Sequence, residues 1–335
     1  MFDISSAFHR ILQDVEISPP LAAILALTQL IEHSDAGTMF ELVKALNDGA
    51  EALKNQASNP ISLNAGCELF IAFVTLFPHD SANFADLKTE LVRQGQNYAA
   101  EGLTYRKKIA ELAFGFIKDG SILTHSYSRV VMQTLLLAHR RKRISVFVTE
   151  ARPRGLGIKT AEALTAAGVP STVILDSAVA YVMDKVDFVL VGSEAVVESG
   201  GLVNAVGSNQ IAIIARAANK PFYALAESYK FHRLFPLSQY DLPSHNSKIL
   251  SFPRPLLADR PTTMNSSPTP PTNESSTPTS NHPDLNPPRI TQEQISQNNP
   301  DVDYTRPDLI SLVFSDVGSL TPEGVSQYLV GMFAG

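Results

Sequence analysis

The feature that most constrains the fold is a regular alternation of short apolar runs and helical patterns between residues 119 and 225. The apolar runs lie at 121–124, 144–149, 171–175, 188–191 and 222–225, and the helical patterns between them lie at about 128–138, 158–167, 178–185 and 209–218. Strand–helix alternation of this kind places the strands side by side in a parallel sheet with helices on both faces. The predicted fold class of this part is therefore α/β, with a doubly wound and mostly parallel sheet.

Residues 1–118 show a different rhythm, with apolar residues at helical spacing and few β-branched runs. Pro19 begins one helix, Pro60 follows a break, and Pro78 ends the next apolar stripe. Apolar residues between 84 and 117 predict two more helices. A helical N-terminal domain at 1–118 followed by an α/β domain at 119–335 is therefore expected.

A third kind of composition interrupts the α/β part at about 244–300, where Pro, Ser, Thr and Asn dominate. Eleven of the 22 prolines lie between Pro253 and Pro300, with few large apolar residues among them. Such a segment buries too little apolar surface to offset the entropy lost on ordering. An apolar run at 309–314 and a helical pattern from Pro322 follow it. We therefore expect a disordered insertion rather than a tail, with a final strand and helix after it.

Charge and cysteine content exclude several classes of protein. Lys and Arg number 27 against 33 Asp and Glu, a net charge of −6, which disfavours a nucleic-acid binder that relies on bulk positive charge. A single cysteine, Cys67, excludes an internal disulfide and a cysteine-based zinc cage. Neither a long apolar span nor a signal-peptide pattern is visible. We expect a cytosolic protein without membrane contact, metal or cofactor.

Polar side chains follow each predicted strand, at the sheet edge where open parallel sheets bind ligands. They are His125 and Ser126, then Glu150, Arg152 and Arg154, then Asp176 and Ser177, then Ser193 and Glu194, and finally Glu227 and Ser228. The arginines could bind phosphate through charge-assisted hydrogen bonds, and helix N-termini after Ser126, Ser177 and Ser208 could add backbone donors. This set predicts a site for a phosphorylated, hydroxyl-rich ligand.

Simpler interpretations compete with this one. Each serine taken alone is more typical of a helix N-cap, and His125 alone is more often a packed histidine than a catalyst. The Gly155–Gly157 pair is only a fragment of a dinucleotide-binding fingerprint. The basic run 140–143 follows a helix, where cations favour the helix dipole. Composition and spacing alone therefore predict a helical domain plus an α/β domain with a polar sheet edge.

Several strings are more specific. They include Thr-His-Ser-Tyr-Ser-Arg-Val-Val at 124–131, Ala-Arg-Pro-Arg at 151–154, Gly-Ser-Glu-Ala at 192–195, Ala-Glu-Ser-Tyr-Lys-Phe at 226–231, Arg-Leu-Phe-Pro-Leu at 233–237 and Asn-Pro-Asp-Val-Asp-Tyr-Thr at 299–305. They closely resemble the family of alpha subunits of eukaryotic translation initiation factor 2B. Its superfamily includes the beta and delta subunits and two isomerases, which act on methylthioribose 1-phosphate and ribose 1,5-bisphosphate. The resemblance covers the chain except about 244–298 and implies a Rossmann-like α/β domain.

The resemblance also implies roles for single residues. The isomerases are similar in carrying a cysteine where this chain has Ser126 and an aspartate where it has Glu194, and these two form their acid–base pair. Serine cannot easily replace a thiol that exchanges protons near neutrality, and glutamate reaches one methylene further. Asn204 is followed here by Ala205 instead of the lysine common in the family. The resemblance therefore implies a sugar-phosphate site without turnover, formed by His125, Ser126, Arg152, Arg154, Asp176, Glu194, Asn204 and Ser208.

The function that the resemblance implies is non-catalytic. The chain would be a homodimeric regulatory subunit that bridges the beta, gamma, delta and epsilon subunits of initiation factor 2B, the complex that exchanges GDP for GTP on initiation factor 2. It would help to sense the phosphorylated alpha subunit of initiation factor 2, with no direct nucleic-acid partner. One alternative is an active sugar-phosphate isomerase of the same superfamily. Another is a beta or delta subunit, although the long N-terminal extension usual in delta is not seen before the first predicted helix.

Overall fold

The structure is a computed structural model that describes residues 2–55, 60–78, 83–245, 249–251 and 290–333. By its internal contacts the chain divides into two compact units, residues 1–245 with 300–335, and residues 246–299. Most of the insertion expected at about 244–300 lies outside the described residues. Within it, Thr291 and Gln294 form a capping box that begins helix α10 (Gln292–Asn298). Part of the segment expected to be disordered is therefore helical.

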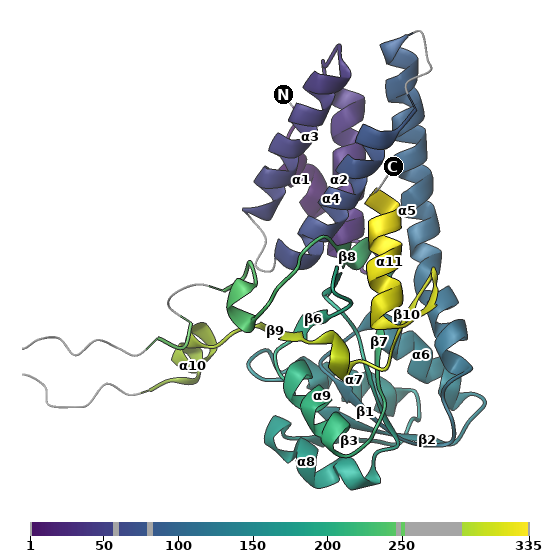
Figure 1. Cartoon of the computed structure of the whole chain (residues 1–335), viewed down its shortest axis with the longest axis vertical. Helices are drawn as coiled ribbons and strands as arrows, with labels where there is room; N and C mark the ends of the chain where they lie inside the picture. The colour runs from purple at the N-terminus through teal and green to yellow at the C-terminus, as the bar shows by residue number, and fades with distance from the viewer. Residues whose placement is uncertain (1, 56–59, 79–82, 246–248, 252–289, 334–335) are drawn as a thin grey trace, which may run out of the picture. The chain divides into compact units, whose positions relative to one another are not determined.

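The N-terminal part of the first unit is a bundle of helices (Figure 1). Its members are α1 (Ile4–Ile11), α2 (Pro19–His33), α3 (Met39–Lys54), α4 (Pro60–Leu76) and α5 (Phe84–Phe114). Side-chain oxygens of Asp3, Thr38 and Asn83 accept hydrogen bonds from the first free N–H groups of α1, α3 and α5. Apolar residues of α1 to α5 form one core.

Helix α5 corrects one sequence-based expectation, because it is a single helix of 31 residues where two were predicted. The middle of α5 contains Gly95 and Gly102, and glycine is an unfavourable residue inside a helix. In the structure both glycines allow α2 to approach closely. A Cβ on Gly95 would lie 2.4 Å from Thr28 Oγ1, and one on Gly102 would lie 2.9 Å from Leu21 Cδ1. The glycines are therefore packing positions and do not end the helix.

The C-terminal part of the same unit is built on a seven-stranded sheet in the order β11-β10-β7-β4-β1-β2-β3. Its strands are β1 (Gly120–His125), β2 (Ile144–Thr149), β3 (Ser171–Ile174), β4 (Phe188–Val191), β7 (Phe222–Leu225), β10 (Leu312–Ser315) and β11 (Gly318–Leu320). Neighbouring strands are parallel except β10 and β11. The α/β fold class with a largely parallel sheet is confirmed.

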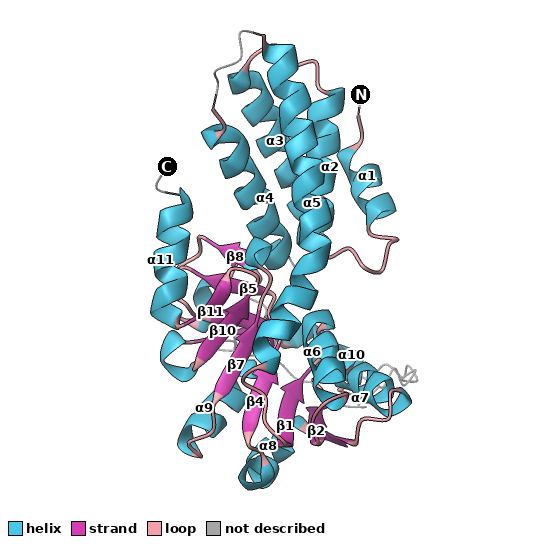
Figure 2. Ribbon diagram, turned by 90° about the vertical axis from the view of Figure 1, so that its right-hand side faces the viewer, coloured by secondary structure: helices cyan, strands magenta, loops and turns pink. Residues whose placement is uncertain are grey.

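Helices cover both faces of this sheet (Figure 2). They are α6 (Arg129–His139) and α7 (Leu156–Ala166) on one face, with α8 (Val179–Val182), α9 (Ser208–Ala217) and α11 (Pro322–Phe333) on the other. Residues 178–185, predicted as one helix, form only α8 between the 3-10 turns η1 (Asp176–Ala178) and η2 (Met183–Lys185). The run 309–314, predicted as a strand, contains the end of turn η5 (Pro307–Leu309) before β10 begins.

A second, four-stranded sheet was not predicted. It has the order β8-β5-β6-β9, with β8 (Phe231–His232), β5 (Ala195–Val197), β6 (Leu202–Ala205) and β9 (Val302–Thr305). The turns η3 (Ser228–Lys230) and η4 (Gln239–Asp241) flank β8 in the sequence. Strand β9 follows the insertion and pairs with β6, so it brings residues from the far side of the insertion into this second sheet. None of the described helices is long and apolar enough to cross a lipid bilayer.

Candidate functional site

The strand order creates one switch point, between β1 and β4. From β1 the chain continues to β2 and β3 on one side, while β4 lies on the other side. Ligands of open parallel sheets bind beside the carboxyl ends of the strands at such a point. His125 ends β1 and is followed by Ser126, and Glu194 follows β4 by three positions. The sequence-predicted residues therefore flank the switch point.

His125 is buried, and both of its ring nitrogens bind within the protein. Nδ1 lies 2.6 Å from Thr149 Oγ1, and Nε2 lies 2.9 Å from the Val206 carbonyl oxygen. Because a carbonyl oxygen only accepts, Nε2 carries the hydrogen and Nδ1 accepts from the hydroxyl. Burial lowers the pKa of His125, which favours this neutral form. His125 thus joins the ends of β1 and β2 to the turn before α9.

Ser126 has a φ of 61°, in the left-handed region that non-glycine residues rarely adopt. Its carbonyl oxygen accepts a hydrogen bond from Thr160 Oγ1 at 2.6 Å. Across the switch point, a Cβ on Gly192 would lie 2.3 Å from Ser128 Oγ, so the loop after β1 lies tightly against the end of β4. The N-cap of α6 is Ser128, which corrects the alternative that Ser126 caps this helix.

The turn that carries both arginines is fixed by Asp176. Its Oδ1 accepts from the backbone N–H of Ala151 at 2.9 Å, and its Oδ2 accepts from the backbone N–H of Arg152 at 2.8 Å. The Arg154 side chain reaches Asp301, with Nε 3.2 Å from Oδ1. The structure therefore brings Arg152 and Asp176 together, but the carboxylate binds backbone groups of the arginine turn.

The two glycines of the fingerprint fragment shape the start of α7, one through its backbone conformation and the other through close packing. Gly155 is the N-cap of α7 with a φ of 66°. A Cβ on Gly157 would lie only 1.7 Å from the Thr149 carbonyl oxygen, a contact that no side chain could make. Helix α7 can therefore begin directly against the end of β2 because residue 157 is glycine.

Strand β6 places Asn204 and Ser208 beside each other. Asn204 Nδ2 donates to Ser208 Oγ at 2.9 Å, and Ser208 Oγ donates to the Ala205 carbonyl oxygen at 2.8 Å. Ser208 is fully buried and is the first residue of α9, whose N-cap is Gly207, so it does not cap the helix as the alternative supposed. The Glu194 backbone N–H donates to the Val203 carbonyl oxygen at 2.9 Å, which holds Glu194 next to this strand.

Asp303 also belongs to this cluster, although it does not follow a strand of the main sheet in the sequence. It pairs with Asn204 across β6 and β9, and its Oδ2 accepts from the backbone N–H groups of Gly207 at 2.7 Å and Asn209 at 3.0 Å. Burial raises the pKa of Asp303 to about 7 in spite of these two donors. Its Oδ1 is buried without a hydrogen-bond partner among the described residues. Asp303 lies in the family-like sequence at 299–305, but only the pairing of β6 with β9 shows that it lies beside Asn204.

A second buried carboxyl, Glu227, follows β7. Its Oε1 lies 3.3 Å from Arg106 Nε, and its Oε2 lies 2.9 Å from Lys230 Nζ. Burial would raise the pKa of Glu227, but the two cations, Lys230 foremost, outweigh burial and hold it at about 2. Lys230 also donates to the Ser193 carbonyl oxygen at 2.9 Å, and Arg106 Nη1 lies 3.1 Å from Glu16 Oε2. This network ties the loop before α2, helix α5 and the loop after β4 to the end of β7.

The predicted residues thus form two groups at the sheet edge. His125, Asn204 and Ser208 surround the turn before α9, while Arg152, Arg154 and Asp176 build the turn after β2. No hydrogen bond or ion pair joins Ser126 to Glu194 in the described part of the chain. The described residues also contain no group of three His, Cys, Asp or Glu side chains that could hold a metal ion. Chemically, the edge offers cationic and neutral hydrogen-bond donors next to buried carboxyls.

Comparison with known proteins identifies relatives of the whole chain. Residues 14–322 match the sequence profile of the Initiation factor 2 subunit family. The chain is 39% identical over 329 residues to translation initiation factor eIF2B subunit alpha of Dictyostelium discoideum, which covers 97% of this chain and 94% of the relative. It is 32% identical over 212 residues to ribose 1,5-bisphosphate isomerase of Archaeoglobus fulgidus, which covers 62% of this chain and 66% of that enzyme.

A solved structure shows the same fold at low sequence identity. The crystal structure of the tetrameric eIF2B-beta2-delta2 complex from C. thermophilum superimposes with a TM-score of 0.69 and 17% identity, covering 99% of this chain and 96% of the other. The arrangement of helical bundle and sheet is therefore shared with that chain.

Proposed function

This chain belongs to the Initiation factor 2 subunit family, and from that premise we propose that it is a regulatory subunit of eIF2B, the guanine nucleotide exchange complex for translation initiation factor 2. The observation that carries the proposal is the 39% identity to an eIF2B alpha subunit along 97% of the chain. In this proposal the subunit works in the cytosol, and the exchange reaction itself belongs to another subunit, epsilon.

The proposed assembly begins with a homodimer that bridges the beta, gamma, delta and epsilon subunits and helps to sense the phosphorylated alpha subunit of initiation factor 2. An exposed apolar edge of the main sheet supports self-association. Strand β3 is an edge strand, and Val173 on it and Leu175 directly after it are 45% and 59% exposed. Exposed apolar patches of this kind mark interaction surfaces.

The dimer is tested by sedimentation equilibrium of the purified chain. We expect a mass near twice 36.3 kDa at micromolar concentration. The variant Val173→Glu, which places a charge on the exposed edge strand, is expected to shift the mass toward the monomer. A strict monomer for the natural chain would contradict an alpha-type role.

The sheet edge is proposed to bind a sugar phosphate. Arg152 and Arg154 lie on the turn after β2, where a phosphate could receive charge-assisted hydrogen bonds. Asn204 and Glu194 supply groups suited to sugar hydroxyls, the buried Ser208 orients the Asn204 amide, and Asp176 positions the arginine turn. His125 holds the frame of the site, since both of its ring nitrogens are already bound.

Catalysis is not part of the proposal, because Ser126 and Glu194 stand where the related isomerases have a cysteine and an aspartate. A serine hydroxyl releases its proton far less readily than a thiol, so it is a poor acid near neutrality. The longer glutamate side chain displaces its carboxylate by about 1 Å or more, and a misplacement of about 1 Å can cost about a hundredfold in rate. Binding without turnover is the expected outcome.

Calorimetry with ribose 1,5-bisphosphate and methylthioribose 1-phosphate tests the site, together with an isomerase assay on the same samples. We expect binding without product. Arg152→Met should weaken binding about tenfold or more, since a hydrogen bond to a charged group contributes about 1.5–3 kcal/mol. Arg140→Met removes an equal charge from an exposed position after α6 and should leave binding unchanged.

The alternative function is that of an active isomerase, favoured by the 32% identity to the archaeal enzyme over 62% of the chain. Sustained product formation by the natural chain would establish it. The decisive experiment for the regulatory role is co-purification of the tagged chain with the beta, gamma, delta and epsilon subunits. Recovery of all four supports that role, and recovery of none contradicts it.

A further inference from the structure

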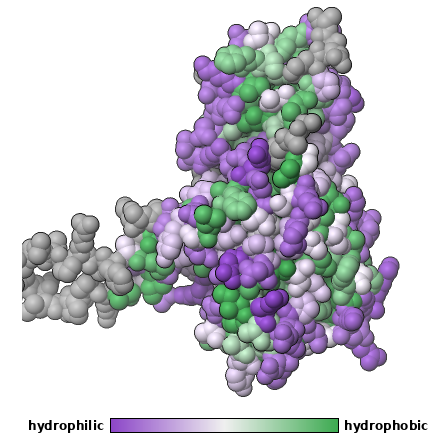
Figure 3. All heavy atoms as spheres, in the orientation of Figure 1, coloured by the Kyte–Doolittle hydropathy of each residue, from purple (hydrophilic) through white to green (hydrophobic). Residues whose placement is uncertain are grey.

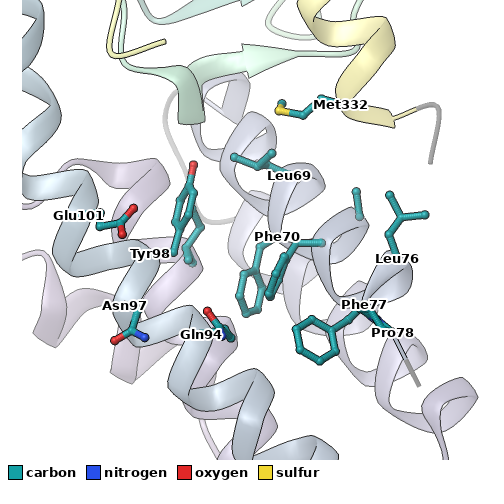
Figure 4. Close-up of a pocket in the computed structure, with 13 residues that line it drawn as sticks. Leu69, Phe70, Leu76, Phe77, Pro78, Gln94, Asn97, Tyr98, Glu101 and Met332 are labelled. Atoms are coloured by element: carbon teal, nitrogen blue, oxygen red, sulfur yellow. The ribbon is translucent and has the colours of Figure 1, made fainter. Parts of the chain in front are cut away.

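The helical bundle contains a cavity of about 510 Å³ between α4 and α5. Ile24 of α2 and Met332 of α11 complete its lining, and Met332 lies at one end of it (Figure 4). None of the lining residues belongs to the sheet-edge site. This cavity falls in the size range of binding sites in proteins, about 300–1,000 Å³.

One wall of the cavity is aromatic. Phe70 and Phe73 of α4 and Phe77 directly after it follow one another along the wall, with ring centroids 6.1 Å apart for the first pair and 5.6 Å for the second. The outer part of this wall is open, since Phe73 is 37% exposed and Leu76 is 52% exposed. Apolar side chains remain uncovered among polar ones on the bundle surface (Figure 3).

The composition of α4 indicates that something covers this wall. Between Pro60 and Leu76 the helix contains a single charged residue, Glu68, and apolar residues occur on every side. A helix that is apolar all round is normally buried all round. In the described chain its inner side packs in the bundle core, whereas Phe73 and Leu76 face outward. A further protein surface is the natural cover for such a wall.

The opposite wall is polar and carries a negative charge. Gln94, Asn97, Tyr98 and Glu101 lie at positions i, i+3, i+4 and i+7 of α5, which places them on one helix face toward the cavity (Figure 4). Glu101 forms no ion pair with any described residue. A basic group on the occupant would therefore complement this wall.

We propose that this cavity is a docking groove for an amphipathic helix of a partner protein, which packs apolar side chains on α4 and directs a basic side chain to Glu101. The polar stripe from Gln94 to Glu101 extends about 10 Å, or two helical turns. The apolar wall on α4 lies beside this polar stripe. A docked helix would place anchor residues at positions i, i+3, i+4 and i+7 against that wall. The proposal is independent of sugar-phosphate binding.

Fluorescence anisotropy with the full chain and a short labelled synthetic helix tests the groove. The probe carries leucines at i, i+3, i+4 and i+7 and one lysine beside them. Phe73→Ser should weaken binding about tenfold or more, as expected for a central aromatic anchor. Phe40→Ser removes a ring that is 81% exposed on α3 outside the cavity and should leave binding unchanged. Equal binding by the natural and Phe73→Ser chains, or no binding by either, would overturn the proposal.

A charge exchange separates the basic contact from general apolar adhesion. Glu101→Lys should weaken binding of the lysine probe and strengthen binding of a probe with glutamate in its place. Thermal unfolding of each variant checks that the fold is intact. If both probes bind the natural and Glu101→Lys chains equally, the proposed contact between Glu101 and a basic side chain of the docked helix is wrong.

The natural occupant is identified with a photoreactive residue in place of Leu76 in the full chain, irradiated in cell extract. The expected cross-linked peptide belongs to another protein, has apolar residues at helical spacing and carries Lys or Arg beside them. Cross-links to a second copy of this chain, to its own insertion or to a segment without that pattern would each contradict the proposal.

Discussion

Two buried carboxyls of this molecule respond to burial in opposite ways. Glu227 faces Lys230 and Arg106, and its pKa falls to about 2, whereas Asp303 faces only backbone N–H groups, and its pKa rises to about 7. Burial penalises both anions, but only full positive charges outweigh that penalty here. Glu227 therefore stays ionised as the partner of two buried cations. Asp303 instead retains an oxygen without a hydrogen-bond partner among the described residues and can exchange a proton near neutrality.

The largest expected effect comes from replacing the charge of the paired carboxyl. Glu227→Gln keeps the shape of the side chain but leaves Lys230 and Arg106 buried beside a neutral group. Breaking a buried ion pair costs about 3–5 kcal/mol of unfolding free energy. Urea unfolding at pH 7 measures it, with Glu162→Gln, an exposed position on α7, as the matched control. If Glu227→Gln lowers the unfolding free energy no more than Glu162→Gln does, the ion pairs of Glu227 do not stabilise the fold, and the two buried carboxyls do not differ in this way.

The same amide substitution at the unpaired carboxyl should act in the opposite direction. The folded-state pKa of Asp303, about 7, lies above the unfolded value of about 3.9. The folded chain therefore holds this proton to higher pH than the unfolded chain, so the contribution of Asp303 to stability falls as pH rises from about 4 to about 7. Because an asparagine amide does not titrate in this range, Asp303→Asn removes this loss of stability at high pH.

We therefore expect Asp303→Asn to be more stable relative to the natural chain at pH 8 than at pH 5, by about 2–3 kcal/mol. Urea unfolding at both pH values gives the difference. Glu227 should behave inversely, because its stabilising contribution is present above the unfolded pKa of about 4.3 and is lost as pH falls toward 2. A pH-independent difference between Asp303→Asn and the natural chain would show that Asp303 does not titrate in this range.

The smallest effect is expected where the carboxylate is exposed to solvent. Asp301 pairs with Arg154 at 3.2 Å, but their side chains are 47% and 32% exposed. Asp301→Asn should change the unfolding free energy by less than about 1 kcal/mol, because solvent screens exposed ion pairs. Thermal unfolding at low and high salt measures the change. If Asp301→Asn lowered the unfolding free energy as much as Glu227→Gln, burial would not determine how much these ion pairs contribute to stability.

Strand positions of the main sheet could be predicted because each buried parallel strand is a short apolar run. The runs 144–149, 188–191 and 222–225 coincide with β2, β4 and β7. The second sheet could not be predicted in this way, because its strands have two to four residues and β9 is separated from β6 by the insertion. Helix α5 was predicted as two helices because its apolar residues were read in two groups, at 84–91 and 109–117. The close contact of Gly95 with Thr28, in the segment between them, depends on tertiary packing.

The candidate site shows the same limit. The rule that ligands bind after parallel strands located His125, Arg152 and Asp176 at the sheet edge. It could not show which atoms bind the protein's own backbone, and both carboxylate oxygens of Asp176 do so. Asp303 was missed because its importance arises from the β6–β9 pairing and from the N-terminus of α9. Local pattern thus gave the location of the candidate site, and tertiary contacts determine which of its side chains bind within the protein.

The continuity of α5 has a mechanical consequence. Glu101 lies at the bundle groove, Arg106 binds Glu227 one and a half turns later, and Ile109 and Ala113 pack with the strands of the main sheet. At 1.5 Å per residue, about 8 Å of unbroken helix separates Glu101 from Arg106. A stiff rod of this kind transmits axial displacement without loss over so short a span. A partner that shifted α5 at the groove would therefore also move the Arg106 side of the ion pair at the end of β7.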